Sequence, residues 1–174
     1  MKSIVAALFA LLILPASALA ETPTGGFSSD ASVAEAPVGR AAIASDRRTA
    51  VAPQGAPAEV VKAIAAANKI TGKPYKWGGG HGRWWDSGYD CSGAVSFVLY
   101  KAGLLDVSRD STGLMSYGES RRGKWITVHA NGGHAYVEIA GLRFDTSGRG
   151  EEGPRWRLEP RSSRGFVARH PAGL

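Results

Sequence analysis

The chain contains a single cysteine, Cys91, in the run Asp90-Cys91-Ser92-Gly93 directly before an apolar segment. Ser92 to Ala102 has the composition of a helix and Asp90 is a favourable N-cap residue, so the sequence predicts the sulfur at a helix N-terminus. The helix dipole and free backbone N–H groups stabilise a thiolate there, and the thiolate is the nucleophilic form. In a secreted chain an unpaired cysteine is an intermolecular link or a reactive thiol, and this position favours reactivity. The alternative is a small buried core residue.

A cysteine nucleophile needs a base to exchange its proton and a third polar group to orient that base. The chain offers four histidines: His81, His129, His134 and His170. Residues 134–140 alternate between polar and apolar side chains, which predicts a strand with one buried face. His134 begins this strand on its polar face, and we identify it as the candidate base. Taken without Cys91, His134 would be interpreted as a solvated strand end.

A two-residue turn at Ala140-Gly141 would fold residues 142–147 back onto this strand. In that register apolar residues face apolar residues, and Glu138 lies opposite Arg143 as a cross-strand charge pair. A slip of one residue would set Glu138 against Phe144. The register with the two-residue turn is therefore the predicted one.

The same register places Asp145 diagonal to His134 on the polar face, within reach of the ring. Asp145 is therefore the candidate orienting residue. Two alternatives stay open. Asp145 could cap the turn that follows it, and a turn of three residues would bring Thr146 to this place instead.

Helical patterns come first in the chain and strand patterns follow, which indicates an α+β fold. The segment after Cys91 is apolar on most sides and predicts a central helix covered by other layers. The predicted helices are Pro57–Ile70, Ser92–Ala102 and a short one within Ser111–Glu119, and the predicted strands are Trp125–Ala130, His134–Ala140, Leu142–Ser147 and Arg164–His170.

The N-terminal part of the chain divides into two segments before the predicted domain. Residues 1–20 have the pattern of a signal peptide: Lys2, an apolar stretch too short to span a bilayer comfortably, and Ala18-Leu19-Ala20 as a cleavage site. An uncleaved anchor is the weaker alternative. Residues 21–56 are rich in Ala, Pro, Ser and Gly, which predicts a disordered tether. Residues 57–174 hold nearly all the aromatic residues and are long enough for one folded domain.

The chain carries 21 Lys and Arg against 15 Asp and Glu, a formal charge of +6 that becomes +5 when Lys2 leaves with the signal peptide. This balance suits an anionic surface such as a cell wall or lipid headgroups, or serves solubility alone. We expect no nucleic acid partner, because the signal peptide predicts export from the cytoplasm and no basic-aromatic recognition motif occurs. Gly78-Gly79-Gly80 lacks the lysine of a phosphate loop, and the scattered histidines lack metal-ligand spacing. We therefore expect no cofactor and no metal.

Three motifs together resemble the NlpC group (NlpC/p-sixty) of papain-like cysteine peptidases from bacterial cell walls: Pro74-Tyr75-Lys76-Trp77-Gly78-Gly79, Asp90-Cys91-Ser92-Gly93 and Gly133-His134-Ala135-Tyr136-Val137. The resemblance runs from about Pro57 to Pro171. It implies a papain-like α+β fold, in which the catalytic cysteine begins a central helix packed on an antiparallel sheet. It also implies hydrolysis of an amide in peptidoglycan stem peptides, commonly the bond from D-glutamate to the diamino acid, with Cys91, His134 and Asp145 as the triad.

The matching positions imply further roles near the nucleophile. Tyr75 would place its hydroxyl near the oxyanion, beside the backbone N–H of Cys91. Ser92 and Trp77 are the other residues expected at the oxyanion and substrate positions.

The chain departs from the family pattern in three places. Asp145 replaces the usual His, Asn or Gln, and Gly123-Lys124 replaces a Gly-Asp pair. The loop Gly80–Tyr89 is long and carries Trp84 and Trp85. These tryptophans, with Trp77, could stack on sugar faces or simply cover the core.

The resemblance and the signal peptide together predict a monomeric, secreted protein that is extracellular, wall-associated or periplasmic. Its partner would be a peptidoglycan peptide, and it would have no membrane span once the signal peptide is removed. Two other functions stay open. The same fold could be an amidase or acyltransferase on another amide, ester or lipid, because the pocket sets the substrate. It could also be a wall-binding module without catalysis, in which Cys91 is unreactive.

Overall fold

In the computed structural model, the described residues are 39–148 and 152–174. The predicted signal peptide and residues 21–38 of the predicted tether lie outside them. No helix within the described ranges is both long enough and apolar enough to cross a membrane.

Six strands form an antiparallel sheet in the order β3-β8-β4-β5-β6-β7. Their bounds are β3 (Glu119–Ser120), β4 (Ile126–Asn131), β5 (His134–Ile139), β6 (Leu142–Asp145), β7 (Arg155–Arg157) and β8 (Val167–His170). The helices within the described ranges are α1 (Ala58–Ile70), α2 (Cys91–Lys101) and α3 (Ser111–Leu114). The predicted α+β class is therefore confirmed.

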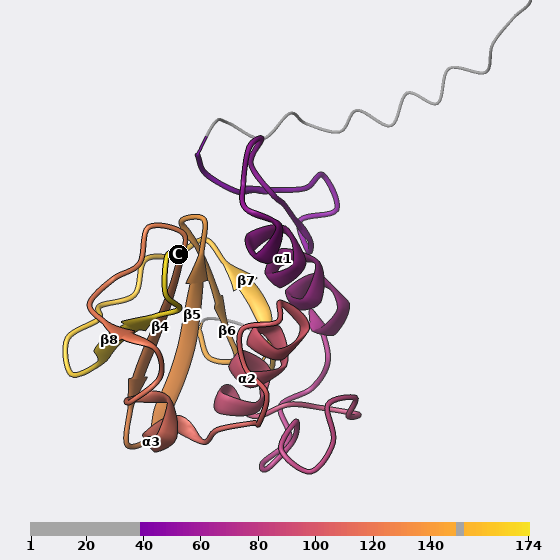
Figure 1. The fold of residues 1–174 in the computed structure, drawn as a ribbon. Coiled ribbons are helices and arrows are strands. Elements are labelled where there is room, and N and C mark those ends of the chain that lie inside the picture. The colour runs from indigo at the N-terminus through magenta and orange to yellow at the C-terminus, as the bar shows by residue number, and fades with distance from the viewer. Residues whose placement is uncertain (1–38, 149–151) are drawn as a thin grey trace, which may run out of the picture. The chain divides into compact units, whose positions relative to one another are not determined.

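The helix that carries the cysteine is central, as its composition predicts. Every residue of α2 from Cys91 to Leu99 is buried. The helix contacts α1 on one side and β5 on the other, and Figure 1 shows α1 and α2 beside the sheet. An element covered in this way is a rigid support for residues at its first turn.

The β5–β6 hairpin has the predicted register, in which Val137 faces Phe144 and Glu138 faces Arg143. The turn residues Ala140 and Gly141 have φ values of 47° and 79°. A two-residue turn of type I′ requires positive φ at both positions. One face of the hairpin joins the apolar core and the other carries its polar side chains.

The described residues include two strands that precede Pro57, the predicted start of the domain. Strands β1 (Ala42–Ile43) and β2 (Ala50–Val51) pair with each other within the segment predicted as a tether. The Asn68 side chain of α1 bonds both the N–H and the carbonyl of Ala50, at 2.9 and 2.8 Å. The sequence predicts disorder here because the segment has few large apolar side chains to bury. The hydrogen bonds to Asn68 hold the segment against α1 in their place.

A close backbone approach fixes the loop that precedes the cysteine. A Cβ atom on Gly93 would lie 1.9 Å from the carbonyl oxygen of Gly79, so only glycine fits in this turn of α2. The same loop lets the N–H of Gly78 donate to Asp90 Oδ2 at 3.0 Å. The glycine-rich segment thus packs across the start of α2 and forms one wall beside Cys91.

Candidate active site

Cys91 is the first residue of α2 and is buried, with 9 % of its surface exposed. Asp90 caps the helix, because its Oδ1 accepts a hydrogen bond from the N–H of Gly93 at 2.7 Å. Burial opposes ionisation of the thiol. Hydrogen bonds from the His134 side chain and the Ala135 N–H, with the charge of the imidazole, outweigh burial and hold the pKa of Cys91 below its ordinary value.

His134, the first residue of β5, links Cys91 to Asp145. Its Nε2 lies 2.9 Å from Asp145 Oδ1 and 3.2 Å from Ser147 Oγ. Its side chain also forms a hydrogen bond with Cys91. Burial opposes the charged imidazolium, but the hydrogen bonds to Asp145 and Cys91 outweigh it and raise the pKa of His134 to about 9. The imidazole is therefore protonated at neutral pH beside a thiol whose pKa is lowered.

The Asp145 side chain has no exposed surface. A carboxylate in such a place needs compensating donors and charges. Burial raises its pKa, but the His134 contact, the N–H of Ser147 and the charge of Arg161 outweigh burial and hold the pKa of Asp145 below its ordinary value. Arg161 Nη1 lies 3.2 Å from Asp145 Oδ2, and Arg143 Nη1 lies 3.7 Å from the same oxygen.

The structure thus brings Cys91, His134 and Asp145 into one chain of contacts. Because the turn after β5 has two residues, Asp145 and not Thr146 faces the imidazole. The catalytic roles of the three residues stay predictions. Sequence reasoning missed Arg161, which lies in an irregular segment and shows no periodic signal.

Two of the other three histidines, His129 and His170, do not line the groove beside Cys91. His129 is buried and stacks on Tyr136 with ring centroids 4.6 Å apart. His170 pairs with Glu119 at 3.3 Å. Among the described residues, no group of three or more His, Cys, Asp or Glu side chains is placed to hold a metal ion.

A groove of about 330 Å³ opens beside Cys91. Its lining residues are Tyr75, Trp77, Gly78, His81, Asp90, Cys91, Ser92, Asp110, Ser111, Thr112, Gly132 and Gly133. Tyr75 and Trp77 are 37 % and 86 % exposed, so both offer surface to a bound molecule. Burial and the nearby charges of Cys91 and Asp90 raise the pKa of Tyr75, which keeps its hydroxyl a donor at neutral pH.

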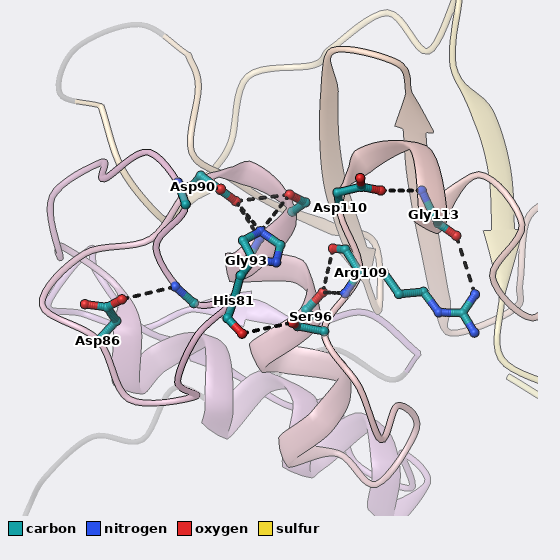
Figure 2. A network of polar contacts seen from close by, with 12 residues as sticks. His81, Asp86, Asp90, Gly93, Ser96, Arg109, Asp110 and Gly113 are labelled. Carbon is teal, nitrogen blue, oxygen red and sulfur yellow. Dashed lines mark hydrogen bonds and ion pairs between the residues drawn. The ribbon is translucent and has the colours of Figure 1, made fainter.

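A second His–Asp contact lies in the groove wall, and sequence reasoning assigned it no role. His81 Nε2 lies 3.1 Å from both Asp90 Oδ1 and Ser92 Oγ (Figure 2). Ser92 also donates to Asp90 at 3.0 Å. Ser92, predicted near the substrate, therefore lines the groove with its hydroxyl held in this network. The hydrogen bond that the His81 ring donates to Asp90 raises the pKa of His81 against the effect of burial.

Two hydrogen bonds tie the opposite wall of the groove to α2. Ser96 Oγ donates to the carbonyl of Arg109 and accepts from its N–H, both at 3.0 Å (Figure 2). The next residue, Asp110, accepts from the N–H of Gly113 at 2.6 Å and lines the groove. Both walls are therefore anchored to the helix that carries Cys91.

Trp84 and Trp85 lie against α2 and are not among the residues that line the groove. Trp84 stacks on Tyr100 with ring centroids 3.9 Å apart, and Trp85 meets the edge of Phe97 at 5.2 Å. Of the three tryptophans named as candidates for sugar stacking, Trp77 is the one at the groove.

A thiol of lowered pKa, a protonated imidazole and a buried carboxylate can together support nucleophilic attack and proton transfer to a leaving group. Comparison with protein-family models and with curated proteins found no match to this chain. The chemistry of the site must therefore be argued from its own geometry.

Proposed function

We propose that this protein is a secreted cysteine hydrolase that cleaves amide bonds in peptidoglycan stem peptides. The observation that carries the proposal is the chain of contacts from the Cys91 thiol through His134 to the buried Asp145. Both pKa shifts favour the thiolate–imidazolium pair, in which the nucleophile and the acid are ready together.

The reaction has two steps. The Cys91 thiolate attacks the amide carbonyl, and the C–N bond breaks as His134 gives its proton to the departing amine. Water then attacks the thioester while His134 takes its proton, and the C–S bond breaks to regenerate the thiolate. Asp145 holds the imidazole throughout, in the way that a carboxylate orients histidine in other triads.

The developing oxyanion needs donors at the start of α2. The backbone N–H of Cys91 lies at the helix N-terminus, and the Tyr75 hydroxyl borders the same groove. We propose these two groups as the oxyanion site, with Trp77 as the exposed aromatic surface along which the substrate lies.

The substrate class rests on the three motifs that resemble the NlpC group and on the signal-peptide pattern. A papain-like arrangement, with the cysteine on a central helix and the histidine on an adjacent antiparallel sheet, agrees with the fold. The excess of basic residues suits an anionic wall. Stem peptides, with D-glutamyl–diamino acid bonds first, are therefore the substrates to test.

The test is digestion of purified muropeptides, with products identified by mass spectrometry. The native protein should release cleaved stem peptides, and Cys91→Ala and His134→Gln should release none. His170→Gln is the matched control, because His170 pairs with Glu119 away from the groove, and it should retain activity.

Equal product from native protein and Cys91→Ala would end the proposal. A transferred acyl group in place of a hydrolysed peptide would support an acyltransferase instead. Binding to the wall with no cleaved product and an unreactive Cys91 would support the binding module.

A further inference from the structure

Arg161 contacts both groups that touch Nε2 of His134. It lies in the segment between β7 and β8, and its side chain is 27 % exposed. Its Nη1 is 3.2 Å from Asp145 Oδ2 and donates to Ser147 Oγ at 2.6 Å. Asp145 and Ser147 are in turn the two partners of Nε2 in the candidate site.

The two oxygens of Asp145 have separate partners. Oδ1 faces His134 and also accepts from the N–H and Oγ of Ser147, at 2.9 and 3.2 Å. Oδ2 faces Arg161 at hydrogen-bond distance, whereas Arg143 at 3.7 Å is a neighbouring charge only. Rotation of this carboxylate would therefore break the Arg161 contact as well as the His134 contact.

Arg161 is itself held in place by aromatic rings. Its guanidinium carbon lies 5.3 Å from the ring centroids of both Tyr136 and Phe166. Phe166 also meets the His134 ring edge-on, with centroids 6.2 Å apart. A planar guanidinium fits this position better than a flexible ammonium, because it stacks on rings and offers donors in fixed directions.

We propose that Arg161 is a positioning residue for the proposed reaction: it fixes Asp145 and Ser147 so that His134 keeps Nε2 toward them and keeps its hydrogen bond with Cys91. The inference rests on the proposed pairing of Cys91 with His134. It goes beyond that pairing because it makes Arg161 the residue that orients the triad. In the proposed reaction Arg161 contacts neither the sulfur nor the substrate.

Alkylation of Cys91 by iodoacetamide tests the inference without any substrate, so it can fail separately from the muropeptide digest. The pH at which the rate reaches half its maximum reports formation of the thiolate. Arg161→Lys keeps the positive charge but loses the planar guanidinium that lies over the rings of Tyr136 and Phe166 and directs Nη1 to Asp145 and Ser147. We expect a rise of roughly one unit in that midpoint and a rate at pH 6 about tenfold lower.

Arg161→Gln should show at least the same loss. Arg164→Gln, three residues along the same segment, should match the native protein. Where cleavage is measurable, kcat should fall while KM stays unchanged, because Arg161 does not contact the groove lining. Circular dichroism of each variant reports folding.

A folded Arg161→Lys with the native midpoint and rate would overturn the inference, because charge alone would then suffice. A rise in KM without a fall in kcat would overturn it too, since it would place Arg161 in substrate binding. If Arg161→Gln does not fold, the lysine variant decides by itself.

Discussion

Replacing His134 by glutamine removes the imidazole and keeps a polar side chain of similar length. The structure makes the imidazole the main group that offsets the burial of Cys91. Without it, burial and the neighbouring Asp90 charge disfavour the thiolate, and the N–H of Ala135 still favours it. We therefore expect the pKa of Cys91 to rise in His134→Gln.

The size of the effect follows from the histidine. Its pKa is raised from 6.5 to about 9, and a shift of about 2.5 units corresponds to roughly 3 kcal/mol of preference for the imidazolium. The two hydrogen bonds that produce it are accepted by Asp145 and Cys91. If about half of this preference belongs to Cys91, its thiolate loses roughly 1 to 2 kcal/mol, which is about a tenfold loss of ionised thiol at neutral pH.

The assay is the second-order rate of iodoacetamide alkylation between pH 4 and pH 10. The native protein should react with a midpoint below that of an ordinary thiol. His134→Gln should react at least tenfold more slowly at pH 7, with the midpoint moved upward, while His170→Gln should follow the native curve. A His134→Gln variant with the native rate and midpoint would refute the paired thiolate on which this reasoning depends.

Three further outcomes are expected. Asp145→Asn removes the hydrogen bond that raises the pKa of His134, so the alkaline limit of hydrolysis should move from near pH 9 to lower pH in a pH–rate profile. Gly93→Ala forces a Cβ onto the carbonyl of Gly79. Thermal unfolding should therefore show a free energy of unfolding lower by roughly 2 kcal/mol or more, and Cys91 should lose its alkylation at neutral pH. Burial raises the pKa of Asp90, but its hydrogen-bond donors outweigh burial and lower it in the fold. The stabilising effect of Asp90 is therefore present above about pH 3.8 and is lost as pH falls through the folded pKa. In Asp90→Asn the free energy of unfolding should decrease less steeply in acid than in the native protein.

The local part of the site follows from the sequence because it depends on short-range rules. The alternation of β5 and the two-residue turn at Ala140-Gly141 determine which residue faces His134, and the observed 2.9 Å contact with Asp145 agrees. The helix start at Cys91 follows from the capping residue Asp90 and the apolar run after it.

The remaining parts depend on contacts between distant segments. Strand β7 (Arg155–Arg157) is short and carries two charged residues, so its pairing with β6 has no alternating apolar signal. Arg161 reaches Asp145 across 16 positions through an irregular segment. His81 meets Asp90 only because its loop folds back over α2, a path that single-residue preferences do not determine.

The hairpin of β5 and β6 separates packing from charge. Val137, Ile139 and Phe144 join the core that holds α1 and α2. The alternate positions carry His134 and Asp145, whose partners are ring nitrogens, hydroxyls and guanidinium groups. Substitutions at these polar positions leave the apolar core filled, so they should change the pKa values of the site more than the packing of the domain. Apolar packing and the charge network therefore lie on opposite faces of this hairpin, so the charge network can be changed by mutation without opening a cavity in the core.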